Sequence, residues 1–246
     1  MDLTIVGCSG SFPSADSPSS SYLFEAEGFR LLVDLGNGAI GPLQRYSELD
    51  RIDAIVLSHL HADHCLDMCA YQVFRTYHPA GELAPIPVYA PAGAAVRLDG
   101  ATGVKSARPM SAVFDFIALS PGTREIGPFR VAADLMNHPV ETFGLRVEHG
   151  GRAIAYSADT GLSEPLVRLA KDADVLICEA SFPDVENLPP DLHLTAAQAA
   201  EHAARAAVGQ LILTHLVPWT DRDHAREQAA AVFAGPLSLA SSGTRV

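Results

Sequence analysis

The chain has 246 residues, of which 48% are hydrophobic and 19% are charged, and its formal net charge is −12. This length suits one large domain or two small ones. The negative charge argues against broad binding to a nucleic-acid backbone, because a basic face supplies most of that affinity. No apolar run approaches the roughly 20 residues of a membrane-spanning helix.

The first residues, MDLTIVGCSGSF, lack the basic region that opens a signal peptide. We therefore expect a cytoplasmic protein with no membrane partner. The cysteines form no CxxC pair, which predicts reduced, buried thiols in an intracellular chain. They are Cys8, Cys65, Cys69 and Cys178.

Short β-rich runs come first: LTIVGC, SSYLFEA and FRLLVDLG, with Gly28 between the last two as in a hairpin. The continuously apolar run DAIVLS at 53–58 is typical of a strand buried on both faces. Apolar residues then recur at helical spacing over 65–78, and APIPVYAP at 84–91 predicts a strand closed by proline. Residues 96–111 are polar and glycine-rich, and their structure and role, as a lid or a dimer contact, stay open.

Four further strands are predicted in the runs VFDFIAL, FRVAADLMN, FGLRVEH and RAIAYSAD. A short helix, PLVRLAKDA, and a buried strand, DVLICEAS, follow. Residues 194–208 predict a strong helix, because alanine has high helix propensity and Thr195 and Gln198 stand at capping-box spacing. The strand QLILTHL and the helix DRDHAREQAAAVFA complete the pattern, and we expect His202 and His224 to face solvent from their alanine-rich helices.

No linker, repeat or low-complexity block divides the chain. Strands dominate the first half and reappear in the second, with helices between them. We therefore predict a single α/β domain over residues 1–246, in which two sheets face each other with helices outside, a four-layer αββα sandwich.

The stretch LSHLHADHC concentrates potential metal ligands where the apolar run IDAIVL ends: His59, His61, Asp63 and His64. A two-residue step at a strand exit points His59 and His61 the same way, so both can bind one ion. Asp63 and His64 lie past the turn, within reach of a second ion. Zinc readily accepts imidazole nitrogen and carboxylate oxygen, and a catalytic site leaves one position for water.

Three more potential ligands stand where apolar strands end. His138 follows VAADLMN, Asp159 follows AIAYSA, and His215 follows QLILT. Loops at strand ends are where rigid scaffolds carry functional residues, so we expect all three at one shared rim of the sandwich.

The pattern HLHADH, with these three residues in order, resembles the dinuclear hydrolases of the metallo-β-lactamase superfamily over essentially the whole chain. The resemblance implies two divalent metal ions, zinc first, with manganese and iron sharing the same ligand types. The implied ligands are His59, His61 and His138 for one ion and Asp63, His64 and His215 for the other. Asp159 would bridge the ions, in a segment that reads SADT here and SGDT in relatives.

Two further segments, CEASF at 178–182 and DLHLT at 191–195, resemble ribonuclease Z and its relatives. There a glutamate orients a histidine that serves the phosphate, and the matching residues here are Glu179 and His193. The pairing is chemically sensible, because a carboxylate on one imidazole nitrogen sets the tautomer and raises the basicity of the other.

One departure from ribonuclease Z concerns the arm with which that enzyme grips tRNA. The interval that should hold the arm, FGLRVEHGGRAIAYSAD, contains only the turn EHGG. Without the arm, and with a net charge of −12, a small phosphodiester is the simpler substrate. The whole-chain pattern most resembles compact bacterial cyclic nucleotide phosphodiesterases of this fold, through stretches such as VGCSGS, HPVETFGLR and LILTHLVPWT.

The resemblance implies that Asp63 takes a proton from the attacking water and that His193, supported by Glu179, protonates the leaving 3′-oxygen. Trp219, four residues past His215, is the one tryptophan and can either stack on a purine or anchor its loop. The alternatives are an RNA-end nuclease, another phosphoester or sulfoester hydrolase, or a non-catalytic metal- or nucleotide-binding module. Resemblance to ribonuclease Z also suggests a homodimer.

Overall fold

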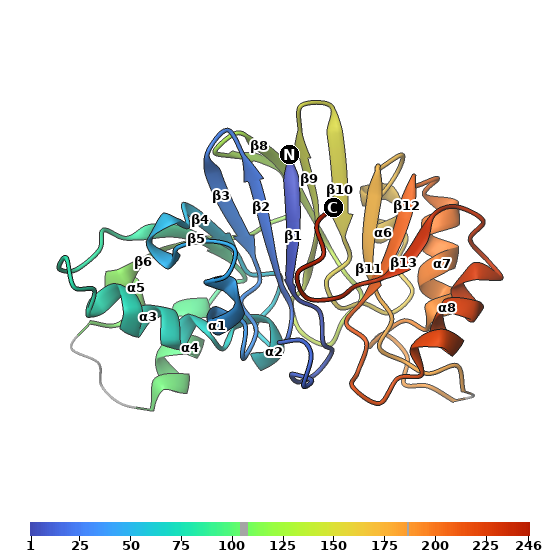
Figure 1. The fold of residues 1–246 in the computed structure, drawn as a ribbon, viewed down its shortest axis with the longest axis horizontal. Coiled ribbons are helices and arrows are strands. Elements are labelled where there is room, and N and C mark those ends of the chain that lie inside the picture. Colours follow the sequence, from blue (N-terminus) through green and yellow to red (C-terminus); the bar gives the residue numbers. More distant parts are fainter. Residues whose placement is uncertain (104–107, 186) are drawn as a thin grey trace.

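Two mixed β-sheets face each other, and helices cover the outer side of each sheet (Figure 1). The computed structural model describes residues 1–103, 108–185 and 187–246. Both sheets begin as antiparallel meanders and continue as parallel strands. The two halves of the chain therefore repeat one plan, and together they form the predicted αββα sandwich.

The first sheet has six strands in chain order. Its strands are β1 (Asp2–Gly7), β2 (Ser21–Ala26), β3 (Phe29–Val33), β4 (Ala54–Val56), β5 (Ile86–Ala90) and β6 (Phe114–Ala118). The helices outside this sheet are α1 (Ile40–Leu43), α2 (Ala62–Cys65), α3 (Met68–Thr76), α4 (Ala94–Thr102) and α5 (Met110–Val113), with a 3₁₀ turn at Leu49–Arg51.

The second sheet has seven strands in the order β13-β12-β11-β10-β9-β8-β7. Its strands are β7 (Gly122–Ile126), β8 (Phe129–Leu135), β9 (Phe143–His149), β10 (Arg152–Tyr156), β11 (Val175–Glu179), β12 (Gln210–Thr214) and β13 (Leu237–Leu239). Outside it lie α6 (Glu164–Leu169), α7 (Ala196–Arg205) and α8 (Arg222–Ala230).

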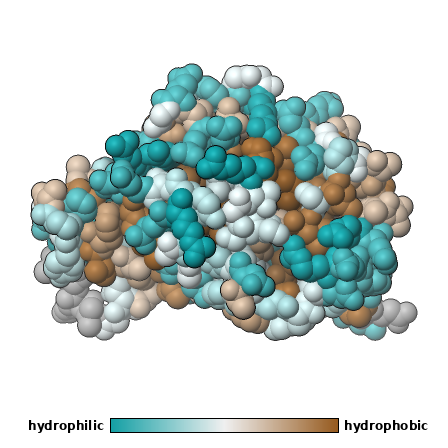
Figure 2. All heavy atoms as spheres, in the orientation of Figure 1, coloured by the Kyte–Doolittle hydropathy of each residue, from teal (hydrophilic) through white to brown (hydrophobic). Residues whose placement is uncertain are grey.

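Three apolar layers hold the four structural layers together. The central layer joins the inner faces of the two sheets, and one layer joins each sheet to its helices. Across the centre, the rings of Phe24 and Phe129 meet edge to face with centroids 6.4 Å apart. Removing a buried ring of this kind typically costs about 3–5 kcal/mol. Outside, Figure 2 shows hydrophilic residues over much of the visible face, with hydrophobic residues gathered in patches between them.

Two local predictions are confirmed. Thr195 and Gln198 make both hydrogen bonds of a capping box at the start of α7. The turn between β9 and β10 contains Gly150 and Gly151, whose φ angles are 60° and 80°. Successive left-handed residues match the right-handed twist of a tight hairpin.

Other predictions are wrong or incomplete. The helix expected over 65–78 is interrupted before α3, because the Asp67 N–H donates to the carbonyl of Leu35 at 3.1 Å instead of continuing the helical ladder. His202 is 2% exposed rather than solvent-facing, since its Nε2 accepts the Ser163 N–H at 3.0 Å.

The strands β7 and β13 and the short helix α1 were not predicted from the sequence. The open interval 96–111 holds most of α4 and the start of α5, and its residues 104–107 lie outside the described chain. Among the described helices, none combines the length and apolar character needed to cross a bilayer.

Candidate metal centre

The predicted ligands meet at one edge of the sandwich, where strands from both sheets end. The strands β8, β10, β11 and β12 run in one direction, so the residues after their last positions reach a shared edge. His138, Asp159 and His215 follow β8, β10 and β12 there, and α2 brings Asp63 and His64 to the same edge (Figure 1). In open α/β sheets this is where ligands bind.

The backbone makes abrupt turns at these strand exits. Asp34, Ala158 and His215 have φ angles of 57°, 51° and 55°, in the left-handed region that non-glycine residues rarely adopt. Such residues persist where surrounding contacts over-determine them. Gly10 packs so closely on this edge that a Cβ there would lie 2.2 Å from the carbonyl oxygen of His215, which explains the glycine in the first loop.

One group of ligand atoms comes from His59, His61, His138 and Asp159, with every pair within 4.8 Å. Nδ1 of His61 lies 3.1 Å from Nε2 of His59 and 3.3 Å from Nε2 of His138. Oδ2 of Asp159 lies 3.6 Å from Nε2 of His59.

The second group comes from Asp63, His64, His215 and again Asp159. Nε2 of His215 lies 3.3 Å from Nε2 of His64 and 3.0 Å from Oδ2 of Asp63. Oδ1 of Asp159 faces this group, 3.2 Å from Nε2 of His64 and 3.5 Å from Nε2 of His215. The two oxygens of one carboxylate therefore point to different groups, as a bridging ligand requires.

These donors fit a pair of metal ions better than they fit one another. Nitrogens bound about 2.0–2.1 Å from a tetrahedral zinc ion would stand about 3.3 Å apart, and the pairs His61–His138 and His64–His215 have that separation. Within the described chain, Oδ1 of Asp159 is buried without a hydrogen-bond partner. A buried carboxylate oxygen left without a partner is costly, and a cation would compensate it.

The far nitrogen of most of these imidazoles is held by a second partner. Nδ1 of His64 bonds Oδ2 of Asp34 at 2.8 Å, and Nδ1 of His138 donates to the carbonyl of Leu192 at 2.9 Å. Nδ1 of His59 lies 3.1 Å from the Ser58 hydroxyl, and Nδ1 of His215 lies 3.1 Å from the Ser181 hydroxyl. Such contacts fix the tautomer and ring orientation of metal-binding histidines.

In the group of His59, His61 and His138, protonation favours cation binding. Burial, helped by the nearby His64, holds the pKa of His59 well below its usual range, and burial also lowers the pKa values of His61 and His138. These imidazoles are therefore neutral at neutral pH, the form that binds metal. Burial alone would raise the pKa of Asp159, but the surrounding histidines hold it well below its usual range.

The predicted pair Glu179 and His193 stands beside both groups. Oε1 of Glu179 accepts a hydrogen bond from Nδ1 of His193 at 2.9 Å, and the His193 ring lies 5.5 Å from the rings of His138 and His215. Backbone N–H groups of Thr160 and Ser181 also donate to this carboxylate. Burial alone would lower the pKa of His193, but the hydrogen bond and charge of Glu179 outweigh it and raise that pKa.

Asp34 was not among the residues predicted from the sequence. Its fully buried carboxylate accepts hydrogen bonds from the Ser58 N–H at 2.7 Å, the Ser58 hydroxyl at 2.8 Å and the Tyr156 hydroxyl at 2.9 Å, besides its contact with His64. The signal that identified Asp159 was present here too, since Asp34 directly follows the buried strand β3. Asp34 connects the ends of β3, β4 and β10.

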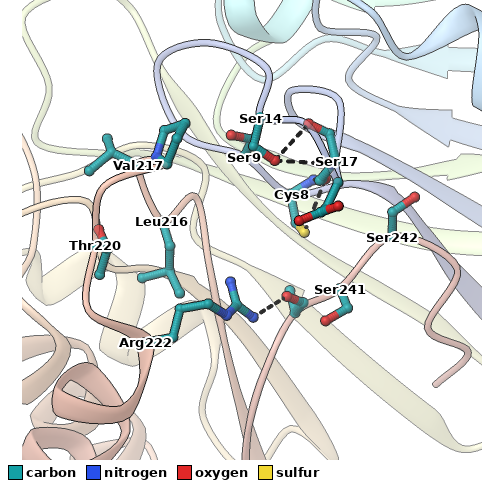
Figure 3. Close-up of a pocket in the computed structure, with 13 residues that line it drawn as sticks. Cys8, Ser9, Ser14, Ser17, Leu216, Val217, Thr220, Arg222, Ser241 and Ser242 are labelled. Atoms are coloured by element: carbon teal, nitrogen blue, oxygen red, sulfur yellow. Dashed lines mark hydrogen bonds between the residues drawn. The ribbon is translucent and has the colours of Figure 1, made fainter.

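Trp219 lies outside both ligand groups. It is 72% exposed, its ring packs 5.3 Å from that of Phe12, and it lines a mainly apolar cavity of about 260 Å³. Arg222, which follows Trp219 in the chain, extends into a different pocket, lined largely by serines (Figure 3). There its Nη2 donates to the carbonyl of Ala240 at 2.8 Å.

Comparison with known proteins agrees with this architecture. Residues 29–216 match the family model described as the β-lactamase superfamily domain. The chain is 39% identical to an uncharacterized protein of Mycobacterium leprae, over 98% of this chain and 86% of the relative. It is 30% identical to ribonuclease Z of Bradyrhizobium diazoefficiens, over 94% of both chains.

A protein of Bacillus subtilis, YhfI, is similar in both sequence and structure. It is named a probable metallo-hydrolase and is 32% identical over 99% of this chain and 98% of its own. Its crystal structure, described as a metallo-β-lactamase fold protein, superposes with a TM-score of 0.88 and covers 100% of this chain and 98% of its own.

Proposed function

The chain belongs to the metallo-β-lactamase superfamily of metal-dependent hydrolases, and from that premise we propose that it hydrolyses a small phosphodiester of the 3′,5′-cyclic nucleotide class, such as cAMP. The observation that carries the proposal is the hydrogen-bonded pair Glu179–His193 beside two adjoining groups of metal ligands. A proton donor next to a pair of cations suits a substrate whose charge sits on a phosphate.

The seven proposed ligands fall into two groups, one with His59, His61 and His138 and the other with Asp63, His64 and His215. Asp159 belongs to both groups. Divalent ions at such a centre would polarise the phosphate oxygens and make water acidic enough to attack near neutral pH. Imidazole and carboxylate donors suit zinc first, and manganese and iron(II) accept the same set.

His193 acts as the general acid in this proposal. Glu179 holds the Nδ1–H, so Nε2 is the nitrogen left for the substrate. When water attacks phosphorus and the bond from phosphorus to the 3′-oxygen breaks, Nε2–H of His193 gives its proton to that oxygen. General acids of this kind typically contribute about 10²–10⁴-fold to the rate.

Asp63 accepts the proton of the attacking water. Its side chain is 11% exposed, against 3% for Asp159, so Asp63 is the more accessible of the two carboxylates in the ligand groups. Its contact with Nε2 of His215 sets its orientation. The proton lost by water and the proton gained by the 3′-oxygen balance, and the product is a nucleoside 5′-monophosphate.

The loops around the centre favour a small substrate over a polyanion. None of the segments that carry the site contains lysine or arginine; they are residues 8–20, 57–68, 136–142, 157–163, 179–200 and 215–221. Binding along a nucleic-acid backbone draws on such residues. The β9–β10 connection, where the resemblance to ribonuclease Z places a tRNA-gripping arm, holds only the turn at Gly150 and Gly151.

A second candidate is an RNA-end nuclease, favoured by the 30% identity with ribonuclease Z over almost the whole chain. It would use the same ligands and the same pair Glu179–His193. The two candidate functions differ in how the protein would bind the parts of the substrate other than the phosphate.

The test is turnover of cAMP and of a short RNA by the purified protein loaded with zinc or manganese, with the bound metal measured in the same samples. We expect cAMP to be consumed and the RNA to be left intact, and Asp63→Ala to lose the activity. Cleavage of the RNA alone would favour the second candidate. No turnover of either substrate by metal-loaded protein would contradict the proposal.

A further inference from the structure

A mainly apolar cavity of about 260 Å³ lies beside the metal centre, between α8, the start of α7 and the loops that follow β11 and β12. Its apolar wall includes Phe182, Val217 and Trp219. The volume falls below the roughly 300–1,000 Å³ that hold a whole drug-sized ligand. A cavity of this size suits one ring system that belongs to a larger molecule bound partly elsewhere.

The cavity adjoins the catalytic pair through one side chain. The ring of Phe182 lines the cavity and meets the ring of His193 edge to face, with centroids 5.2 Å apart. On the other side, Val217 is two residues past the ligand His215. A group that sits against Phe182 is therefore separated from the phosphate-facing histidine by a single ring.

An aromatic surface is left uncovered at this place. Trp219 is 72% exposed and Phe12 is 40% exposed, and the two rings pack 5.3 Å apart at a 42° angle. Large exposed aromatic groups beside a cavity mark sites for ligands or partners. Aromatic side chains bind nucleobases by stacking, which typically contributes about 1–3 kcal/mol per base.

Polar groups are present for the edge of a base. Nε2 of Gln228 donates to Oδ2 of Asp184 at 2.9 Å, so the amide is held in place with its carbonyl oxygen as a further acceptor. Thr220 and His224 also line the cavity. An amide oxygen, a hydroxyl and an imidazole beside apolar rings are the groups that read the hydrogen-bonding edge of a purine.

The charge around the cavity argues against the binding of a second phosphate there. The loop segments at the cavity contain no lysine or arginine, and the acidic residues Asp184 and Asp221 line its wall. A second phosphate would therefore meet repulsion here, whereas an uncharged ring with amino groups would not.

We propose that this cavity, walled by Phe182 and Trp219 and edged by Gln228, is the subsite for the nucleobase of the substrate. The inference rests on the proposed function for the identity of the substrate, and it names a purine carrying an amino group as the preferred base. The phosphate would lie at the metal centre, and the base would lie on the far side of Phe182.

The single tryptophan makes this subsite directly measurable, because all tryptophan fluorescence of the chain comes from Trp219. The experiment titrates zinc-loaded protein with 5′-AMP and, separately, with ribose 5-phosphate, which shares the sugar and phosphate but lacks the base. We expect saturable quenching of fluorescence by AMP and no matching change with ribose 5-phosphate. The variants Phe182→Leu and Gln228→Ala should weaken AMP binding by about fivefold or more.

Val96→Ala is the matched control, since Val96 is 78% exposed on α4 outside the other sheet and its removal should leave the titration unchanged. Equal responses to the two ligands, or no response to AMP, would overturn the subsite. Quenching by AMP in a protein that leaves cAMP intact would overturn the proposed function and keep the subsite. Turnover of cAMP without base-dependent quenching would overturn the subsite and keep the proposed function.

Discussion

The metal centre and the aromatic cavity beside it are built on opposite physical principles. In the candidate metal centre, most of the polar side chains are buried, and most of the imidazoles are oriented by a second contact, as Asp34 orients His64. At the cavity, Trp219 is exposed on a loop and touches Phe12 in place of a packed core. The first arrangement holds atoms in place for chemistry, and the second leaves surface free for a ligand.

This difference separates two kinds of effect. A change in the metal centre should alter metal content and turnover, because it removes a group that acts on the reacting atoms. A change in the cavity should alter mainly KM, because it removes binding that is the same before and during reaction.

The largest effect is expected from Asp159→Ala, which removes the carboxylate shared by both ligand groups. The five histidines would then surround a site without the carboxylate charge that both groups share, so we expect metal content to fall and cAMP turnover to drop to background. Elemental analysis and a turnover assay check both. A variant that retained both ions and full activity would show that the shared carboxylate is not a ligand.

His193→Ala should lower kcat by about 10²–10⁴-fold, the range for loss of a general acid, and leave the metal content unchanged. Steady-state kinetics with metal analysis would separate this effect from loss of ions. His78→Ala, two residues past the end of α3, is the control and should behave as wild type. An equal effect of both variants would remove His193 from the chemistry.

Asp34→Asn tests whether the metal centre extends to residues that touch no metal. The amide keeps the size of the side chain but loses the charge that faces His64, and loss of such a partner typically lowers metal affinity by about 10–100-fold. Competition with a chelator measures this affinity. Asp115→Asn on the exposed side of β6 is the control, and an unchanged affinity in Asp34→Asn would contradict the assignment.

Phe12→Ala should have the smallest effect of these variants, and the effect should be on KM and not on kcat. It removes the ring that packs on Trp219, a contact of a type that contributes about 0.5–1.5 kcal/mol, so KM for cAMP should rise about two- to tenfold with little change in kcat. Michaelis–Menten analysis distinguishes the two parameters. A fall in kcat without a change in KM would mean that the aromatic pair belongs to the metal centre.

The same division explains what could be read from the sequence. Candidate metal ligands belong to few residue types and stand where apolar strands end, so the sequence alone pointed to HLHADH, His138, Asp159 and His215, which the structure brings together. Asp34 obeys the same rule, but a single aspartate after a strand is too common a pattern to stand out. The cavity was not recognisable, because Phe182, Trp219 and Gln228 come from separate loops and a helix whose spatial proximity no local pattern encodes.

The errors in the fold have the same cause. The interruption before α3 depends on the contact between Asp67 and Leu35 across the fold, and no helical periodicity records such a contact. His202 is buried because α6 begins against it, although an alanine-rich helix with one histidine predicts an exposed imidazole. Where local chemistry decided the outcome, as in the capping box of α7 and the glycine turn after β9, the sequence was sufficient.

The most direct measurement is the identity of the product formed from cAMP by zinc-loaded protein, resolved by chromatography against both adenosine monophosphates. Protonation of the 3′-oxygen by His193 requires 5′-AMP as the product, and His193→Ala should lose its formation while keeping its metal. Accumulation of 3′-AMP, or no product from protein that holds both ions, would contradict the account.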